Sequence, residues 1–471
     1  MAVLPFLVIL AHLLGVGSAL RAIFTARSSQ GAVAWSLALV LLPYLTVPIY
    51  WILGSSRFQG YLDARRGGAS KLADDLSSAL ESIRQWQEDT DDERGDIRAV
   101  ERLARLPTLR GNTTELLVDG EETFTSLFEG IEAARESIVV QYYIIRDDET
   151  GRRLQSLLMD RARAGVGVHL LYDAIGSYAL PSRYTRELKA AGVEVHPFRS
   201  TRFGRPTRFQ VNFRNHRKIV VVDGRVGWIG GLNVGDEYRG LDPDYGDWRD
   251  THLRVEGPAA LALQLTFVED WYWATSTVPE LPWTPRSAGE ESVLVLPSGP
   301  ADERTTAGLF MQLAFHSATE RIWVASPYFV PDDGVLEALK VAAFRGVDVR
   351  ILIPDRSDSR AVDLARIPSL ERLLRAGVRV HRYTEGFFHA KTILIDEAVG
   401  GVGTVNLDYR SFQLNFEITA LLFAPQPVQA LADSFEDDLG RSPELTLDQL
   451  MDLSFAHRLA SRVAHLFAPV L

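Results

Sequence analysis

Two segments of the chain carry the same chemically capable residues at the same spacing. They read NHRKIVVVDGRVGWIGGLN and FHAKTILIDEAVGGVGTVN. The matched residues are His216, Lys218, Asp223 and Asn233 in the first segment, and His389, Lys391, Asp396 and Asn406 in the second. A single copy of this pattern could be a histidine and a lysine on an exposed strand face. Two copies with identical spacing indicate a site to which both contribute.

Two imidazoles together with two ammonium groups suit displacement at phosphorus in two steps. One neutral imidazole can attack phosphorus and form a covalent phosphohistidine, while the other, protonated, donates to the departing alkoxide. Both protonation states are accessible because the ordinary pKa of histidine is about 6.5. The lysines and asparagines can stabilise charge on the non-bridging oxygens, so no metal or other cofactor is expected.

Each motif has the pattern of a β-strand, in which positions i and i+2 share a face. The histidine and the lysine of each motif therefore point the same way, and the apolar residues that follow them fill a core. Asp223 and Asp396 complete the two catalytic motifs, but each ends its strand and faces away from its lysine. This position predicts a structural role for both aspartates.

Two further carboxylates could orient the imidazoles. Asp250, in DWRDTHLRVE, comes after His216 in the first half, and Glu417, in LNFEITALLF, comes after His389 in the second. An acidic residue on a neighbouring strand can fix the tautomer of a catalytic histidine. Either acid could instead be an ordinary surface carboxylate.

The motifs lie inside a longer internal repeat. The segments SIVVQYYIIRDD, RAGVGVHLLYD and LKAAGVEVHPF are matched later by RIWVASPYFVPDD, FRGVDVRILIPD and LLRAGVRVHRY. Short β-branched runs that alternate with amphipathic helices predict an α/β fold with a mixed sheet flanked by helices in each half. We place the halves at residues 113–288 and 289–471, related by a pseudo-twofold arrangement that brings both motifs to their interface.

The first 55 residues differ from the rest of the chain. Residues 3–20 and 31–53 are apolar stretches, and the second contains no charged residue. A helix of about 20 apolar residues crosses a bilayer, so residues 1–55 are predicted to form a two-helix transmembrane hairpin. A secretory signal peptide is the alternative for the first stretch, although no lysine or arginine precedes it.

Residues 56–112 are polar and are predicted to be a connector that contains one helix and separates the membrane from the body. Basic residues are more numerous after the second apolar stretch than between the two stretches. This distribution favours a cytoplasmic location for the catalytic halves.

The composition limits the partners. The net charge is −11, so the chain as a whole does not attract nucleic acid, which is not an expected partner. The chain has no cysteine, which excludes disulfides, thiolate nucleophiles and cysteine-based metal sites. The sequence leaves the oligomeric state open.

The duplicated motif resembles that of the phospholipase D superfamily. Within it, the segments LLPYLTVPIYWILGSSRF, GGLNVGDEY, WRDTHLRVEGPA and GTVNLDYRSFQLNFE are similar to the bacterial cardiolipin synthase family. The resemblance covers nearly the whole chain. It implies two phospholipase D-like domains, a multi-pass location in the bacterial inner membrane, and phosphatidylglycerol and membrane lipids as partners. The implied reaction joins two phosphatidylglycerol molecules to give cardiolipin and glycerol.

The same resemblance implies roles for particular residues. His216 is expected to be the nucleophile, and His389 the general acid and base. Many superfamily members have serine where this chain has Gly231. Thr404 fills the equivalent place in the second motif, where its hydroxyl could contact phosphate.

Two other functions stay open. The same residues could serve hydrolysis, as in a phospholipase D or a phosphodiesterase nuclease, with water in place of the glycerol hydroxyl. A non-catalytic membrane scaffold would have degraded motifs, whereas both motifs are intact. The apolar N-terminal segment favours a lipid substrate, because it keeps the site near the bilayer.

Two basic and apolar segments suggest contact with anionic lipid. The first half carries an insertion just before His216 that contains no acidic residue. Its basic and aromatic residues are Arg199, Arg202, Arg205, Arg208 and Arg214, with Phe203, Phe209 and Phe213. They predict a membrane-contacting lip at the site entrance, with an ordinary surface loop as the alternative. The C-terminal RLASRVAHLFAPVL could lie on the same surface.

Overall fold

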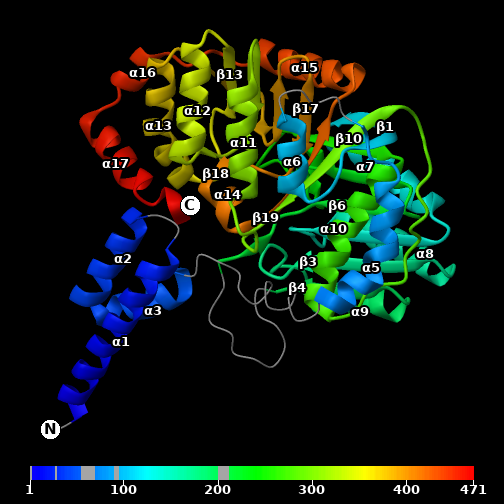
Figure 1. Cartoon of the computed structure of the whole chain (residues 1–471), viewed down its shortest axis with the longest axis horizontal. Coiled ribbons are helices and arrows are strands. Elements are labelled where there is room, and N and C mark those ends of the chain that lie inside the picture. Colours follow the sequence, from blue (N-terminus) through cyan, green and yellow to red (C-terminus); the bar gives the residue numbers. More distant parts are fainter. Residues whose placement is uncertain (1–2, 27–28, 55–68, 90–94, 200–211, 471) are drawn as a thin grey trace.

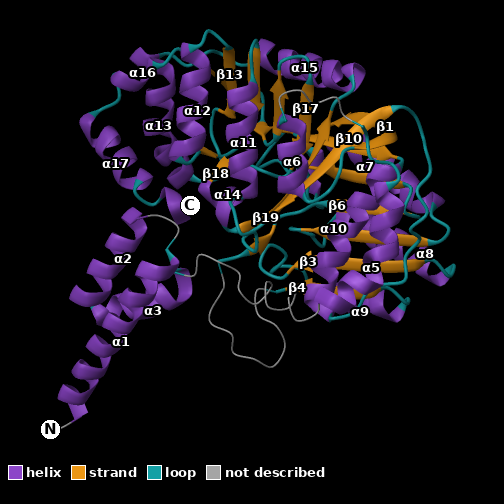
Figure 2. Cartoon of the chain, viewed as in Figure 1, coloured by secondary structure: helices purple, strands orange, loops and turns teal. Residues whose placement is uncertain are grey.

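The computed structural model describes residues 3–26, 29–54, 69–89, 95–199 and 212–470 (Figure 1). Its body is a 15-stranded mixed β-sheet flanked by helices, which confirms the predicted α/β class (Figure 2). Strands β11, β13 and β14 run parallel to one another, as do β2, β3 and β4, and the strands between these two groups pair antiparallel.

The strand order places β1 and β10 side by side in the middle of the sheet. From one edge to the other the order is β14 (Arg379–Tyr383), β13 (Asp348–Pro354), β11 (Arg321–Ala325), β16 (Thr392–Ile395), β17 (Val399–Gly403), β19 (Asn415–Leu422), β10 (Glu291–Ser298), β1 (Leu109–Val118), β9 (Thr251–Glu256), β7 (Val226–Gly230), β6 (Ile219–Val222), β2 (Ser137–Tyr142), β3 (Gly167–Asp173) and β4 (Glu194–Phe198). The short strands are β5 (Arg214–Asn215), β8 (Trp248–Arg249), β12 (Phe329–Val330), β15 (Phe387–Phe388) and β18 (Leu407–Asp408).

Helices cover the sheet in both halves of the body. Those of the first half are α7 (Asp119–Ala133), α8 (Glu149–Arg163), α9 (Ser182–Ala190) and α10 (Pro258–Thr275). Those of the second half are α11 (Thr306–Ser317), α12 (Asp333–Phe344), α13 (Arg360–Arg375), α14 (Tyr409–Gln413), α15 (Pro425–Gly440), α16 (Leu447–Met451) and α17 (Phe455–His465). Two short 3-10 turns lie at Asp236–Arg239 in the first half and at Ala468–Val470 after α17.

The repeated glycines occupy equivalent turns between a helix and the next strand. Gly165 and Gly346 have φ of 90° and 87°, and Gly192 and Gly377 have φ of 98° and 89°. Glycine adopts this left-handed conformation without the strain that a Cβ would cause. The turns of the two halves are therefore the same, as the repeat predicts.

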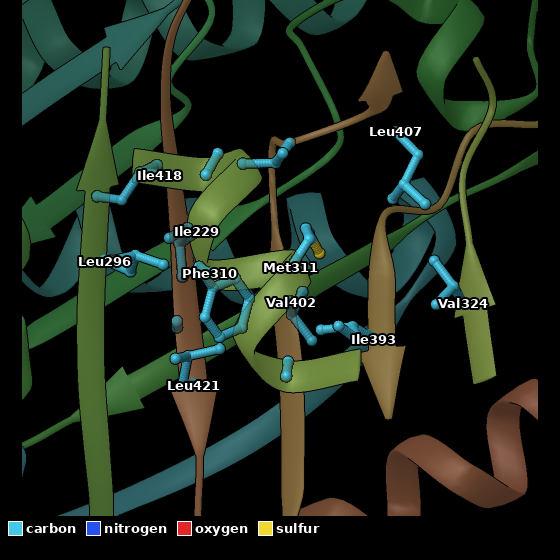
Figure 3. Close-up of a cluster of buried hydrophobic side chains, with 14 of the residues drawn as sticks. Ile229, Leu296, Phe310, Met311, Val324, Ile393, Val402, Leu407, Ile418 and Leu421 are labelled. Atoms are coloured by element: carbon cyan, nitrogen blue, oxygen red, sulfur yellow. The ribbon is translucent and has the colours of Figure 1, made fainter. Parts of the chain in front are cut away.

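One hydrophobic core runs through both halves. Figure 3 shows Phe310 and Met311 of α11 packed among strand side chains that include Ile418 and Leu421 of β19. Ile229 of β7, from the first half, belongs to the same cluster. Because the apolar surface is shared across the boundary, separating the halves would expose it to water.

The N-terminal segment differs in part from the predicted hairpin. Helix α1 (Val3–Thr25) is long and apolar enough to cross a membrane, over Pro5–Thr25. The second stretch is two helices, α2 (Ser29–Leu41) and α3 (Pro43–Leu53), and both pack on α1. The helix breaks at Pro43, because proline lacks the N–H and clashes with the preceding turn.

Residues 69–89 and 95–112, predicted to belong to a spacer between the membrane and the body, are instead part of the body. The chain there forms α5 (Ala69–Arg84) and α6 (Asp96–Ala104), and Ile83, Val100 and Leu106 are buried in the main core. Strand β1 begins at Leu109, so the predicted boundary between residues 112 and 113 falls inside a strand of the sheet. The polar residues of this segment form only one face of amphipathic helices, and the body covers the other.

The arginine-rich insertion lies mostly outside the described residues, including Arg202, Arg205 and Arg208. Phe213, at its end, is buried in the main core, so this residue does not belong to a membrane-contacting lip. Arg214 lies in β5, which pairs with β19 of the second half.

Candidate active site

The two motifs meet where the halves adjoin. His216 follows β5, and its backbone N–H donates to the carbonyl of Phe416 at 2.9 Å. His389 follows β15, and its backbone N–H donates to the carbonyl of Arg249 at 2.7 Å. Each motif histidine is therefore held by a strand of the opposite half.

Each imidazole is also paired with a carboxylate of the opposite half. His216 Nδ1 lies 2.8 Å from Glu417 Oε2, and His389 Nδ1 lies 2.7 Å from Asp250 Oδ2. Sequence order suggests the opposite pairing, with each acid serving the histidine of its own half, and that pairing is wrong. The pairing crosses between the halves because of the backbone contacts of the two histidines. His216 bonds to Phe416, the residue before Glu417, and His389 bonds to Arg249, the residue before Asp250. Both carboxylates are buried, which excludes the reading of them as surface groups.

The two pairs fix the state of the imidazoles. Burial would raise the pKa of Glu417 and Asp250, but the neighbouring imidazoles and lysines hold the pKa of both carboxyls below its usual range. An ionised carboxylate only accepts hydrogen bonds, so each Nδ1 donates and each Nε2 carries the lone pair. Burial lowers the pKa of His216 and of His389, so both imidazoles are neutral at pH 7. A neutral imidazole is the form that attacks phosphorus.

The two lysines bring buried positive charge to the same place. Lys218 Nζ donates to the carbonyl of His216 at 2.7 Å, and Lys391 Nζ donates to the carbonyl of His389 at 2.5 Å. Each ammonium also lowers the pKa of the histidine in the opposite motif. The two motifs therefore form one electrostatic unit, in which the two lysine ammonium groups can attract an anionic group.

The lysines predict an alkaline limit to activity. Burial lowers the pKa of Lys218 to about 7 and that of Lys391 to about 8. Each ammonium is charged below its pKa and loses its charge as the pH rises through it. We therefore expect kcat/KM for an anionic phosphodiester to fall between about pH 7 and pH 9, because kcat/KM reports the free enzyme.

A pH profile of the Lys218→Arg variant is the control for this prediction. The guanidinium stays protonated over this range, so the first alkaline loss should disappear while the loss due to Lys391 remains. A wild-type profile that stays level to pH 10 would show that neither lysine titrates as proposed.

Asp223 and Asp396 lie away from the paired histidines and have a structural role, as their positions predict. Both have the left-handed φ of 52°. Asp223 Oδ1 accepts the backbone N–H of Glu136 at 2.7 Å, and Asp396 Oδ1 accepts that of Glu320 at 2.8 Å. Each carboxylate thus ties the end of a motif strand to the start of the neighbouring strand.

The two asparagines are buried but are not equivalent. Asn233 Oδ1 accepts the N–H of Ile144 at 3.1 Å, and its Nδ2 donates to the hydroxyl of Tyr238 at 3.1 Å. Asn406 Oδ1 is buried and finds no hydrogen-bond partner among the described residues. Asn233 therefore holds the local structure, whereas the amide oxygen of Asn406 can still accept a hydrogen bond.

Thr404 supports a catalytic carboxylate. Its hydroxyl is buried and accepts the N–H of Ile418 at 2.9 Å. A hydrogen bond from Thr404 also contributes to the low pKa of Glu417, against the effect of burial. The hydroxyl is thus engaged by β19, and its predicted contact with phosphate stays a proposal.

Gly231 occupies the equivalent place in the first half, where space is tighter. A Cβ there would come within 2.1 Å of Asp250 Oδ1. We expect Gly231→Ser to displace Asp250 from His389 and to lower kcat by on the order of 10²-fold, because small misplacements of catalytic groups have effects of that size. Steady-state kinetics measures the effect, and circular dichroism checks the fold.

Thr404→Ser is the matched control for Gly231→Ser. It keeps the hydroxyl at the equivalent position and should change kcat little. An unchanged kcat in Gly231→Ser would contradict the inferred crowding against Asp250.

Several residues that shape the site were not predicted from the sequence. The ring of Tyr143 packs edge-on against His216 at 5.1 Å between centroids, and the ring of Trp248 lies 5.2 Å from that of His389. Arg217 points to the opposite side of the motif strand, where it forms a buried ion pair with Asp270 at 2.8 Å. Arg217 lies one residue from both His216 and Lys218, and successive side chains of an extended segment point to opposite sides. This alternation was a signal in the sequence that Arg217 faces away from them.

Comparisons with known proteins agree with this fold. A family model described as "Cardiolipin synthase, PLD-like domain" matches residues 127–243 and 312–439. Cardiolipin synthase A of Pseudomonas entomophila is 46% identical, over 99% of this chain and 98% of that protein. Cardiolipin synthase A of Pseudomonas fluorescens strain Pf-5 is 44% identical, over 99% and 98%.

A solved structure shares the fold at much lower identity. The crystal structure of phosphatidylserine synthase from Haemophilus influenzae superposes with a TM-score of 0.63 at 16% identity, over 80% of this chain and 100% of that one. The fold and the paired motifs define a protein of the phospholipase D-like class. Within that class, the chain belongs to the cardiolipin synthase family.

Proposed function

We propose that this chain is a phosphatidyltransferase that makes cardiolipin. It moves the phosphatidyl group of one phosphatidylglycerol to the glycerol hydroxyl of a second, releasing glycerol. Family membership supports this function. The observation that carries it is the crossed pairing of His216 with Glu417 and of His389 with Asp250, which orients two imidazoles at one interface.

In the first step, His216 Nε2 attacks phosphorus. A nitrogen–phosphorus bond forms, and the bond from phosphorus to the glycerol oxygen breaks. His389 donates the proton that the departing alkoxide takes, so glycerol leaves as a neutral alcohol. The bound phosphodiester is an anion, which raises the pKa of a nearby imidazole and favours protonation of His389 in the complex.

In the second step, the glycerol hydroxyl of another phosphatidylglycerol attacks the same phosphorus. His389 accepts the hydroxyl proton, the nitrogen–phosphorus bond breaks, and cardiolipin leaves. Lys218, Lys391 and Asn406 stabilise the charge on the non-bridging oxygens in both steps. The buried charge of the two lysines stabilises the transition state in the way that a bound metal ion does in other phosphodiester enzymes.

The two halves are proposed to be phospholipase D-like domains at residues 113–288 and 289–471. The strand order supports a pseudo-twofold relation, because β2, β3 and β4 occupy one edge and β11, β13 and β14 the other. The shared φ of the repeated glycines supports it too.

The N-terminal helices are proposed to anchor the enzyme in the bacterial inner membrane. Helix α1 supplies one span, and α2 with α3 supplies a broken second span. The larger number of basic residues after the second span favours a cytoplasmic side for the catalytic halves. The apolar length of α1 and the packing of α2 and α3 against it support this arrangement.

The test uses two phosphatidylglycerol species with acyl chains of different mass, mixed with the full chain in detergent micelles. Mass spectrometry should detect mixed cardiolipin and one glycerol for each cardiolipin formed. A chelator such as EDTA should leave the rate unchanged. Phosphatidic acid and glycerol without cardiolipin would show the hydrolytic alternative instead.

A further inference from the structure

Helix α17 and the turn after it carry their large apolar residues on the outside. The exposed fractions are 74% for Phe455, 53% for Leu459, 48% for Val463, 77% for Leu466 and 57% for Phe467. The spacing of three to four residues places these side chains on one face of the helix. A helix whose purpose was only to cover a core would bury this face.

The inner face of α17 is made of small residues. Ser461 and Ala468 are buried and Ala464 is half-buried, and Ala464 and Ala468 pack with Val362 and Ala365. Polar contacts fix the same orientation: Arg462 pairs with Glu371 at 2.9 Å. The helix therefore cannot simply rotate to bury its apolar face, because α13 holds it from the other side.

The charges around α17 fit an anionic partner. Residues 453–471 contain two arginines and two histidines and no acidic residue, in a chain with a net charge of −11. An apolar stripe alone would also suit a protein partner. An apolar stripe flanked only by basic side chains is typical of helices that lie in the interface of an anionic bilayer.

The C-terminal end of α17 lies next to the candidate active site. Ala468 belongs to a cluster with Val330, against which Tyr328 and Tyr409 pack. The ring of Tyr328 lies 6.3 Å from the ring of His389. In the view of Figure 1, α17 and the C-terminus are on the side of the body where the N-terminal helices lie. A bilayer in contact with α17 would thus lie on the side of the body near His389.

We propose that α17, with the turn through Phe467, lies in the headgroup region of an anionic phospholipid bilayer and holds the candidate active site near it. This contact is a second attachment, separate from the N-terminal helices. It goes beyond the proposed reaction, because it concerns where the catalytic body rests rather than which bond it makes.

A single introduced cysteine tests the contact directly, since the native chain has none. Leu459→Cys carries an environment-sensitive fluorophore, and the full chain is reconstituted in vesicles of phosphatidylglycerol and phosphatidylcholine with nitroxide-labelled lipid. The emission should shift to the blue and be quenched several-fold by the nitroxide. Vesicles of phosphatidylcholine alone should give weaker quenching.

Phe344→Cys is the matched control. Phe344 is a large apolar residue, 72% exposed, at the C-terminal end of α12. Its label should be quenched by aqueous iodide and not by the nitroxide lipid.

Three results would overturn the proposal. A Leu459 label as accessible to iodide as the control would show that α17 faces water. Shielding from iodide without nitroxide quenching would show a protein partner or a second copy of the chain. Equal quenching in neutral vesicles would remove the electrostatic part. None of these readouts requires turnover, so they are independent of the proposed reaction.

Discussion

Replacing His216 with alanine is expected to abolish turnover and the covalent intermediate together, whereas replacing His389 should abolish only turnover. The distinction appears with a phosphatidyl ester of p-nitrophenol, whose leaving group needs no proton. His389→Ala should release one equivalent of nitrophenol in a burst and then stall, because nothing deprotonates the acceptor. His216→Ala should show no burst and a rate lower by at least about 10⁴-fold.

Rapid-mixing absorbance measures the burst, and mass spectrometry of the stalled protein locates the adduct. The adduct should lie on His216. A burst in His216→Ala and none in His389→Ala would reverse the two roles. Loss of the burst in both variants would show that the two histidines act in a single step.

The crossed pairing predicts that each carboxylate variant resembles the histidine variant of the opposite half. Glu417→Gln should lose the burst, because a glutamine amide that donates to Nδ1 of His216 moves the proton to Nε2 and blocks the nucleophile. Asp250→Asn should keep the burst and slow turnover, because it disturbs His389. We expect each to lower kcat by about 10²- to 10⁴-fold, as for other carboxylates that orient a catalytic histidine.

Glu256→Gln is the control for these variants, because Glu256 lies at the end of β9, the strand that follows Asp250, and outside the site. It should have wild-type kinetics. A burst that survives in Glu417→Gln and disappears in Asp250→Asn would indicate pairing within each half.

Much of this site can be predicted from the sequence because it is built from local patterns. The apolar runs of the motifs and the repeated Gly-Val turns have short-range signals, and the structure confirms β6, β16 and the turns at Gly165 and Gly346. The histidine and lysine of each motif were expected on the strand itself, whereas the structure places them in the segment just before β6 or β16. The pairing of the carboxylates has no such signal. His216 and Glu417 are 201 residues apart in sequence, and only the pairing of β5 with β19 across the two halves brings them together.

Other features differed from the prediction for physical reasons that a local pattern does not reveal. A proline in an apolar stretch can kink a helix or end it, and at Pro43 the helix ends and a new one begins. The segment before β1 has the composition of a linker, yet Ile83, Val100 and Leu106 are buried because the body offers an apolar surface to them. The outward face of α17 likewise depends on α13, which holds its small residues.

The crossed pairs also set the moment at which a newly made chain becomes active. His216 leaves the ribosome 201 residues before Glu417 does. At about 5–20 residues per second, that interval lasts about 10–40 s. During this time the first half can already be tethered to the bilayer by the N-terminal helices, but its imidazole has no carboxylate to orient it. On the proposed mechanism, we therefore expect the nascent chain to be unable to attack the surrounding lipid until the second half has been made and has folded against the first.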